Sequence, residues 1–171
     1  MSLKISLCSV PVEGVGTKLD RTREENSLGI VPKVAIVSIV EWMKLSGYNE
    51  DSYDFYDIDM LYPSDDEIIK YFSTYRPDVV GLSAVVSTSY SQVNRISKII
   101  REELPNAWIV MGGNLSAVAE AVLKHTEVDI CVIGDGEIPW VQLLKYFETN
   151  NPRYIDKKHL STIRGAAFLD Q

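Results

Sequence analysis

The stretch from residue 77 to residue 89 constrains the fold more than any other part of the chain. It begins with Pro77, continues as a valine-rich apolar run with one glycine, and ends in small hydroxylated residues. Such a run is typical of a parallel strand that is buried on both faces. Ligands of open parallel sheets bind outside the carboxyl ends of the strands. We therefore expect Ser83, Ser87 and Ser89 to lie where the polar atoms of a ligand would arrive.

Strand-like and helix-like segments alternate along the rest of the chain. Besides the stretch above, strand patterns cover residues 4–10, 53–59, 108–111 and 129–133. Helical spacing follows each strand, over residues 32–46, 65–75, 89–104, from 115 onward and from 139 onward. Short connections and right-handed crossovers then predict an α/β fold: a doubly wound, flavodoxin-like or Rossmann-like sheet of five parallel strands with helices on both faces.

Local signals support several of these helices. The segment 32–46 has β-branched residues that would suit a strand, but Pro32 near its start and Gly47 after its end favour a helix. Ser64 and Glu67 have the spacing of a capping box, in which each side chain satisfies a free backbone amide of the other. Ser89 and Gln92 offer a weaker version of the same box.

Composition limits the class of protein. With 171 residues and 46% hydrophobic content, the chain suits one globular domain with a sizeable core. A formal net charge of −7 argues against nucleic acid and against an anionic membrane as partners. The sequence contains neither a long apolar run nor a signal-peptide pattern, so we expect a cytoplasmic protein. Cys8 and Cys131 lie in apolar runs and are expected to be reduced core thiols.

Two segments fall outside the alternation. Residues 11–26 are rich in glycine and charge and should form a long loop after the first strand, where mononucleotide folds hold their ligand loop. Periodicity also stops at about residue 150. We interpret residues 1–149 as one domain and residues 150–171 as a linker, within which residues 163–168 could form a short strand.

Small residues follow three of the predicted strands. Gly112 and Gly113 could serve only to turn the chain tightly into the next helix. They could also leave room for a flat ligand on the backbone, with the next helix start offering free amides to a phosphate. Together with Ser83 and with Gly134–Gly136, they would form a groove. No G-x-G-x-x-G fingerprint follows the first strand, so NAD and FAD are not expected.

In this order and spacing, the motifs resemble the cobalamin-binding domain that precedes the catalytic barrel in cobalamin-dependent radical S-adenosylmethionine (SAM) enzymes. The resemblance covers residues 32–147 and depends on residues 81–87, Gly112-Gly113 and residues 134–137. The tail at residues 163–165 also resembles the link into that barrel. It implies a base-off cobalamin whose displaced dimethylbenzimidazole tail meets Ser83, with Val85 packing beside it and Ser87 adding a hydroxyl.

The cofactor-binding residues expected from the groove and from the resemblance are Ser83, Val85, Ser87, Ser89, Gly112, Gly113, Asn114, Gly134, Gly136 and Glu137. For Glu137, a cap on the last helix is the favoured alternative. Asp57 and Asp59 could contact a ribose hydroxyl, but acidic residues at strand ends are more often solvated. No catalytic residue is assigned, because the sequence offers neither a Ser-His-acid set nor paired carboxylates in the groove.

The chain departs from other cobalamin domains, which carry D-x-H-x-x-G after the first strand and ligate cobalt through its histidine. Here the two histidines, His125 and His159, are expected to be surface or structural residues, so the resemblance implies that no protein histidine or other metal ligand reaches cobalt. The cluster motif C-x-x-x-C-x-x-C is also missing. An iron-sulfur cluster and SAM would then belong to sequence beyond Gln171.

These expectations lead to two main hypotheses. In the first, the chain is the cobalamin-binding module of a radical SAM enzyme that performs methyl transfer or related radical chemistry, and this module does not catalyse alone. In the second, it is a docking domain of the same kind of parent enzyme that has lost its ligand. A flavodoxin-like or response-regulator-like role ranks last, because Ser83 and Ser87 stand where a receiver domain needs an aspartate.

Overall fold

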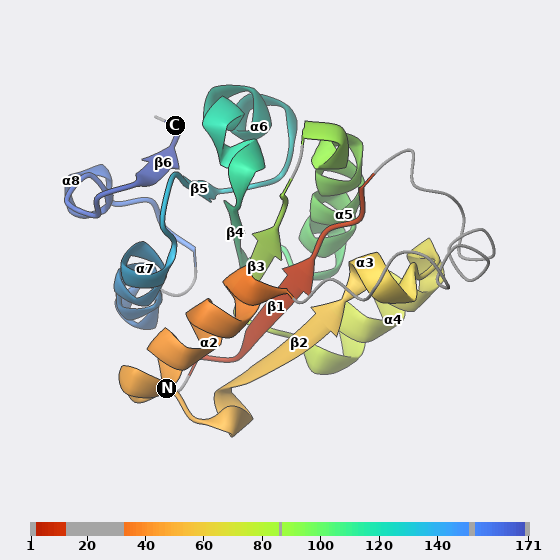
Figure 1. Cartoon of the computed structure of the whole chain (residues 1–171), viewed down its shortest axis with the longest axis horizontal. Helices are drawn as coiled ribbons and strands as arrows, with labels where there is room; N and C mark the ends of the chain where they lie inside the picture. Colours follow the sequence, from red (N-terminus) through yellow and green to blue (C-terminus); the bar gives the residue numbers. More distant parts are fainter. Residues whose placement is uncertain (1–2, 13–32, 86, 151–152, 170–171) are drawn as a thin grey trace.

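A six-stranded, mostly parallel sheet forms the centre of the computed structural model, which describes residues 3–12, 33–85, 87–150 and 153–169. Figure 1 shows its strands crossing the molecule between two layers of helices. The sheet order is β2-β1-β3-β4-β5-β6. The strands are β1 (Ile5–Ser9), β2 (Tyr53–Asp57), β3 (Val79–Ser83), β4 (Trp108–Gly112), β5 (Ile130–Val132) and β6 (Ala166–Phe168).

The flavodoxin-like order of the first five strands is confirmed, but the prediction of a five-stranded sheet is wrong. The sixth strand, β6, comes from the tail and pairs antiparallel with β5, with Ile130 opposite Phe168 and Val132 opposite Ala166. The possible short strand at residues 163–168 is therefore present, but three residues have too little alternation to indicate that they join the sheet. Gly165 enters it with a φ of +91°, and its carbonyl accepts a 2.8 Å hydrogen bond from the amide of Ile133.

Helices cover both faces of the sheet, as expected. Helix α2 occupies the ambiguous segment, so the choice of helix there is confirmed. The helices are α2 (Val34–Leu45), α3 (Ile58–Leu61), α4 (Asp65–Tyr75), α5 (Tyr90–Glu103), α6 (Ala119–His125), α7 (Glu137–Thr149) and α8 (Lys157–Leu160), with short 3₁₀ helices η1 (Glu50–Ser52), η2 (Ser87–Ser89) and η3 (Asn114–Val118). The loop expected over residues 11–26 lies almost entirely outside the described residues.

Each face of the sheet has its own core. Helices α4, α5 and α6 pack on one face, where Phe72 and Ile96 belong to a cluster of buried side chains. Helices α2 and α7 lie on the other face, where Met43, Trp108 and Phe147 belong to the second cluster. Trp108 stacks on Phe147 with ring centroids 4.5 Å apart. The sheet therefore separates two layers, and the site described below lies in the layer that contains α2 and α7.

One of the two capping boxes expected from the sequence is present in the structure. The capping box of α4 is confirmed, since the Ser64 amide donates to Glu67 at 2.8 Å and the Glu67 amide donates to Ser64 at 3.3 Å. The weaker box at Ser89 is wrong: its side chain caps nothing, and its buried hydroxyl has no hydrogen-bond partner among the described residues.

Cys8 and Cys131 are buried and unpaired, and burial raises the pKa of both thiols to about 12.

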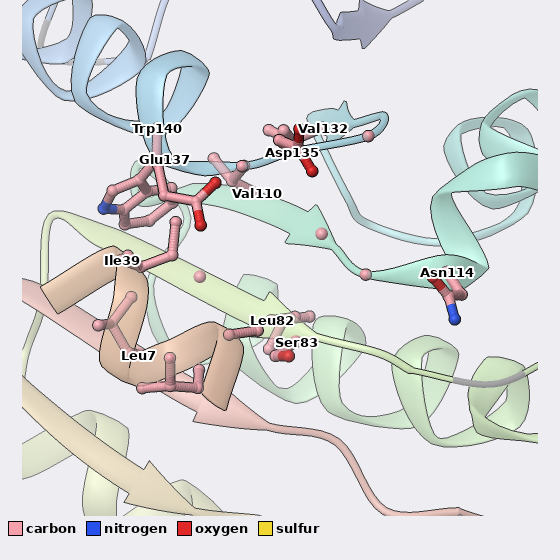
Figure 2. Close-up of a pocket in the computed structure, with 17 residues that line it drawn as sticks. Leu7, Ile39, Leu82, Ser83, Val110, Asn114, Val132, Asp135, Glu137 and Trp140 are labelled. Atoms are coloured by element: carbon pink, nitrogen blue, oxygen red, sulfur yellow. The ribbon is translucent and has the colours of Figure 1, made fainter. Parts of the chain in front are cut away.

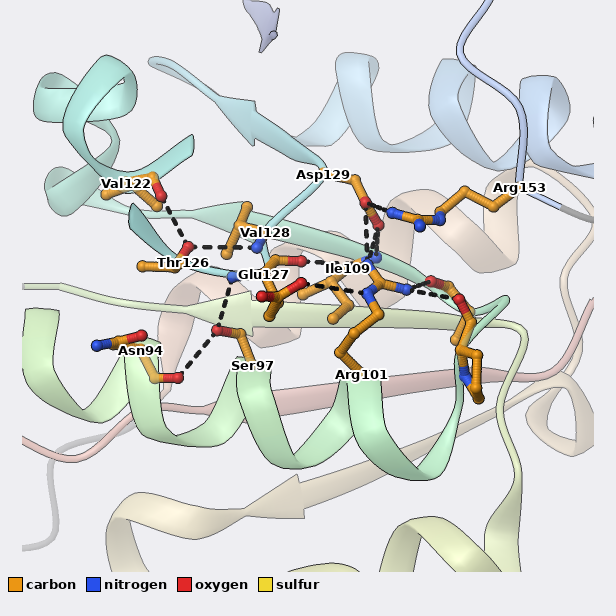
Figure 3. A network of polar contacts seen from close by, with 12 residues as sticks. Asn94, Ser97, Arg101, Ile109, Val122, Thr126, Glu127, Val128, Asp129 and Arg153 are labelled. Carbon is orange, nitrogen blue, oxygen red and sulfur yellow. Dashed lines mark hydrogen bonds and ion pairs between the residues drawn. The ribbon is translucent and has the colours of Figure 1, made fainter. Parts of the chain in front are cut away.

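A buried polar network ties the tail to the sheet at the ends of the strands opposite the site (Figure 3). Asp129, just before β5, accepts hydrogen bonds from Arg101 of α5 at 2.8 and 2.9 Å and from the Ile109 amide at 2.8 Å. Arg153, in the tail, also pairs with Asp129. One carboxylate thus holds α5, β4 and the start of the tail together.

Across the described residues, every helix is too short or too polar to cross a bilayer.

Candidate functional site

A cavity of about 280 Å³ lies between the carboxyl half of the sheet and helices α2 and α7. Figure 2 shows the side chains that surround it, with Ile39 of α2 and Trp140 of α7 on one side and the strands on the other. Its walls come from β1, β3, β4, β5 and the two helices. The cavity therefore opens where a doubly wound sheet is expected to hold its ligand.

The inner part of the cavity is apolar, because the register brings small and aliphatic residues into one row. Leu7 of β1 and Val110 of β4 both pair with Gly81 of β3, so the three residues lie side by side on the same face. Above them, the indole of Trp140 approaches Gly81 so closely that a Cβ on that glycine would lie 2.8 Å from Cη2 of the ring. Trp140 thus forms the inner end of the cavity, and only glycine fits beneath it.

The outer part of the cavity lies at the ends of β3 and β4. Ser83 pairs with Gly112 in the register, two residues beyond the inner row. A Cβ on Gly112 would meet no atom within 4 Å, so this glycine opens directly onto empty space. Gly113 differs: its φ is +94°, and a Cβ there would lie 2.4 Å from the carbonyl oxygen of Ala84. Gly112 therefore provides space for a ligand, whereas Gly113 is required by the backbone.

A hydrogen bond joins the two helices that cover the cavity. Ser38 of α2 donates to Oε1 of Glu137 at the start of α7, with 2.6 Å between the two oxygens. This bond, together with the backbone amides of Gly136 and Glu137, lowers the pKa of the Glu137 carboxyl. Glu137 lines the cavity and is ionised at neutral pH. Its carboxylate therefore holds α2 against α7 as well as contributing to the first turn of α7.

The structure brings together seven of the ten residues predicted to bind a cofactor. These seven line the cavity: Ser83, Gly112, Gly113, Asn114, Gly134, Gly136 and Glu137. Val85, Ser87 and Ser89 do not line it. After β3 the chain turns through η2 into α5, which packs on the opposite face of the sheet. Val85 is consequently 54% exposed and Ser89 is fully buried.

Several wall residues were missing from the sequence-based set. They are Leu7, Ala35, Ile36, Ile39, Gly81, Leu82, Val110, Val132, Asp135 and Trp140. A signal existed for some of them, because Leu7 and Val110 share a strand face with the predicted positions and Trp140 lies one helical turn after Glu137. No sequence signal indicated that α2 would cover this part of the sheet.

The remaining candidates have structural roles. Asp57 caps α3 by accepting a hydrogen bond from the Met60 amide at 3.1 Å and also bonds to Ser9, and Asp59 pairs with Lys33. His125 is the exposed last residue of α6, and His159 packs edge-on against Tyr146 with ring centroids 5.0 Å apart. Neither histidine lines the cavity.

Known proteins match this chain over part or most of its length. It is 28% identical over 144 residues to an anaerobic magnesium-protoporphyrin IX monomethyl ester cyclase of Cereibacter sphaeroides, which covers 83% of this chain and 22% of the cyclase. It is 31% identical over 91 residues to TokK, a cobalamin-dependent radical SAM methyltransferase of Streptomyces tokunonensis, covering 52% of this chain and 13% of TokK.

A third relative is cytidylyl-2-hydroxyethylphosphonate methyltransferase of Streptomyces wedmorensis, 28% identical over 88 residues, covering 51% of this chain and 16% of the relative. The chain thus spans less than a quarter of the length of these relatives. The family model of the B12 binding domain matches residues 25–144, which include β2 to β5 and every cavity residue except Leu7. The chain belongs to the B12-binding domain family.

Proposed function

We propose that this chain binds cobalamin at the carboxyl edge of its sheet, with the nucleotide tail of the cofactor inserted into the cavity between α2 and α7. The observation that carries this proposal is the open space above Gly112, where a Cβ would meet nothing within 4 Å. The cavity of about 280 Å³ is smaller than the sites that hold whole drug-sized ligands. It therefore suits one planar group of a large cofactor better than the whole of it.

The residues at the cavity fit this use. Ser83 would meet the tail at the mouth, Gly112 and Gly113 would let the backbone approach it, and Asn114 and Glu137 would offer polar atoms at the rim. Because the tail would lie in the cavity, its base would not ligate cobalt, so we propose base-off cobalamin. Because neither histidine lines the cavity, we propose no histidine ligand from this chain. Bound cobalamin supplies a cobalt centre that can carry a methyl group or take part in radical chemistry.

In a longer protein, we propose, the domain presents cobalt to a radical SAM domain, with the 150–171 segment as the link between them. TokK, a cobalamin-dependent radical SAM methyltransferase, matches 52% of this chain, which supports the proposal. An iron-sulfur cluster and SAM would be supplied by that other domain. Methyl transfer or related radical chemistry would then be a property of the whole protein and not of this domain alone.

Retention of cobalamin tests the proposal directly. The purified protein is mixed with hydroxocobalamin and desalted, and its visible spectrum is recorded. We expect a coloured protein with a base-off spectrum. A colourless protein at micromolar cofactor contradicts the proposal and favours the docking domain that has lost its ligand.

A matched pair of variants locates the binding site. Gly112→Leu should abolish retention, because the new side chain extends into the cavity without meeting a neighbour. Thr74→Leu adds the same side chain to an exposed position on α4, across the sheet, and should retain cobalamin fully. Gly113→Leu is a poorer probe, because strain at its backbone would disturb the fold. If Gly112→Leu folds and still retains cobalamin, the tail does not occupy this cavity.

A further inference from the structure

Among the residues that the structure describes, no polar side chain is directed at the inner end of the cavity. Leu7, Val110 and Gly81 form its floor, and these residues lie in neighbouring strands of a continuous parallel sheet. Their backbone amides and carbonyls are therefore used by the strand ladder. A group that enters this part of the cavity meets carbon atoms only.

The indole nitrogen of Trp140 is a polar atom near this end, but it faces elsewhere. The atoms of Trp140 closest to Gly81 are the ring carbons Cη2 and Cζ3, at 2.8 and 3.2 Å from the position of an added Cβ. In Figure 2 the indole nitrogen lies on the side of the ring away from Leu82 and Ser83. The indole therefore closes the cavity with its carbon edge and offers no donor to a ligand there.

Polar atoms are confined to the mouth. Ser83 lies two residues beyond Gly81 along β3, and Glu137 already accepts the hydroxyl of Ser38. A base that reaches the inner row has therefore moved past the hydroxyl of Ser83. Polar atoms on the far edge of that base would lose their water and gain no hydrogen bond, which weakens binding.

We infer that this cavity selects the tail base of a cobalamin-type corrinoid by its lack of hydrogen-bonding partners, and that Trp140, Gly81 and Val110 are its specificity-determining residues. It should accept a methylated benzimidazole and disfavour adenine, whose amino group and ring nitrogens would be buried without partners. This inference rests on the proposed function. Because one unpartnered polar group weakens binding about tenfold or more, we expect the adeninyl corrinoid to bind about 10 to 100 times more weakly.

The test compares three corrinoids on the wild-type protein by equilibrium dialysis with detection by absorbance: cobalamin, its adeninyl analogue, and cobinamide, which has no tail base. Tighter binding of cobalamin than of both others supports the inference. Equal binding of cobalamin and the adeninyl analogue overturns it and leaves the proposed function standing. Equal binding of cobalamin and cobinamide also overturns it, because the tail then contributes nothing. Failure to bind any of the three contradicts the proposed function itself.

Two isosteric variants sharpen the test. Val110→Thr places a hydroxyl in the inner row and should narrow the preference for cobalamin over the adeninyl analogue by about tenfold. Val79→Thr places the same hydroxyl in the same buried core, two residues before Gly81 and outside the cavity, and should leave the preference unchanged. If both variants change the preference equally, the hydroxyl acts through the fold and not through contact with the base.

Discussion

Helices α5 and α2 lie on opposite faces of the sheet and bury very different numbers of side chains. Helix α5 has 14 residues and buries five of them, whereas α2 has 12 residues and buries only Ile36 and Met43. On the α2 side the cavity fills part of the space that side chains occupy on the α5 side. The comparison suggests a division of roles: α5 supplies stability, and α2 gives up packing to leave room for a ligand.

The largest test of this division is Asp129→Ala, which removes the carboxylate that α5 shares with the tail. The side chain of Asp129 is 4% exposed and that of Arg101 is 15% exposed. Removing one partner of a buried pair leaves the other charge uncompensated, so we expect the free energy of unfolding to fall by about 3–5 kcal/mol. Urea denaturation measures this change.

The exposed pair between Glu120 and Lys124 on α6 provides the control for that variant. Glu120→Ala should leave the denaturation midpoint unchanged within error, since exposed pairs contribute little. Folded Asp129→Ala protein should still retain cobalamin, because this network lies at the opposite end of the strands from the cavity. A loss below about 1 kcal/mol would show that solvent already screens the network.

A second test compares equal truncations on the two faces. Ile96 of α5 is fully buried, so Ile96→Ala should lower the free energy of unfolding by about 2–5 kcal/mol. Ile39 of α2 is half-buried and borders the cavity, so Ile39→Ala should lower it by about 1 kcal/mol or less. Corrinoid affinity should respond in the opposite order, with the larger loss at Ile39. Equal losses in the free energy of unfolding for the two variants would contradict the division of roles.

The smallest expected effect concerns the bond between Ser38 and Glu137. Because this bond lowers the pKa of the folded Glu137 below its ordinary value of 4.5, its contribution to stability is present at neutral pH and disappears as the pH falls below that value. Ser38→Ala should raise this pKa toward 4.5, which an NMR titration of the Glu137 carboxyl carbon can measure. An unchanged pKa would assign the shift to the backbone amides of the helix start instead.

Much of the fold could be predicted because buried parallel strands are continuous apolar runs. Four of the strands lie inside or close to the predicted segments, and the stretch at residues 77–89 contains β3 as expected. The possible short strand at residues 163–168 contains β6, but its antiparallel pairing with β5 was not predicted, because that pairing depends on contacts distant in sequence.

Residues of the site could be predicted only at the ends of the strands, where the strand order alone brings them together. Small residues at strand ends converge because parallel strands place their carboxyl ends at one edge, so Ser83, Gly112 and Gly134 were found together. The wall from α2 depends on how a helix docks across the sheet, which no local pattern encodes. Ser87 and Ser89 were misplaced because the chain passes to the other face after β3.

The close fit between Gly81 and Trp140 also restricts how related chains can diverge. Any larger residue at position 81 would displace the indole, since an added Cβ would lie 2.8 Å from Cη2. The two positions should therefore co-vary among related chains, with a bulkier residue at 81 accompanied by a smaller one at 140. Changes at this pair would resize the inner end of the cavity, since Trp140 closes it.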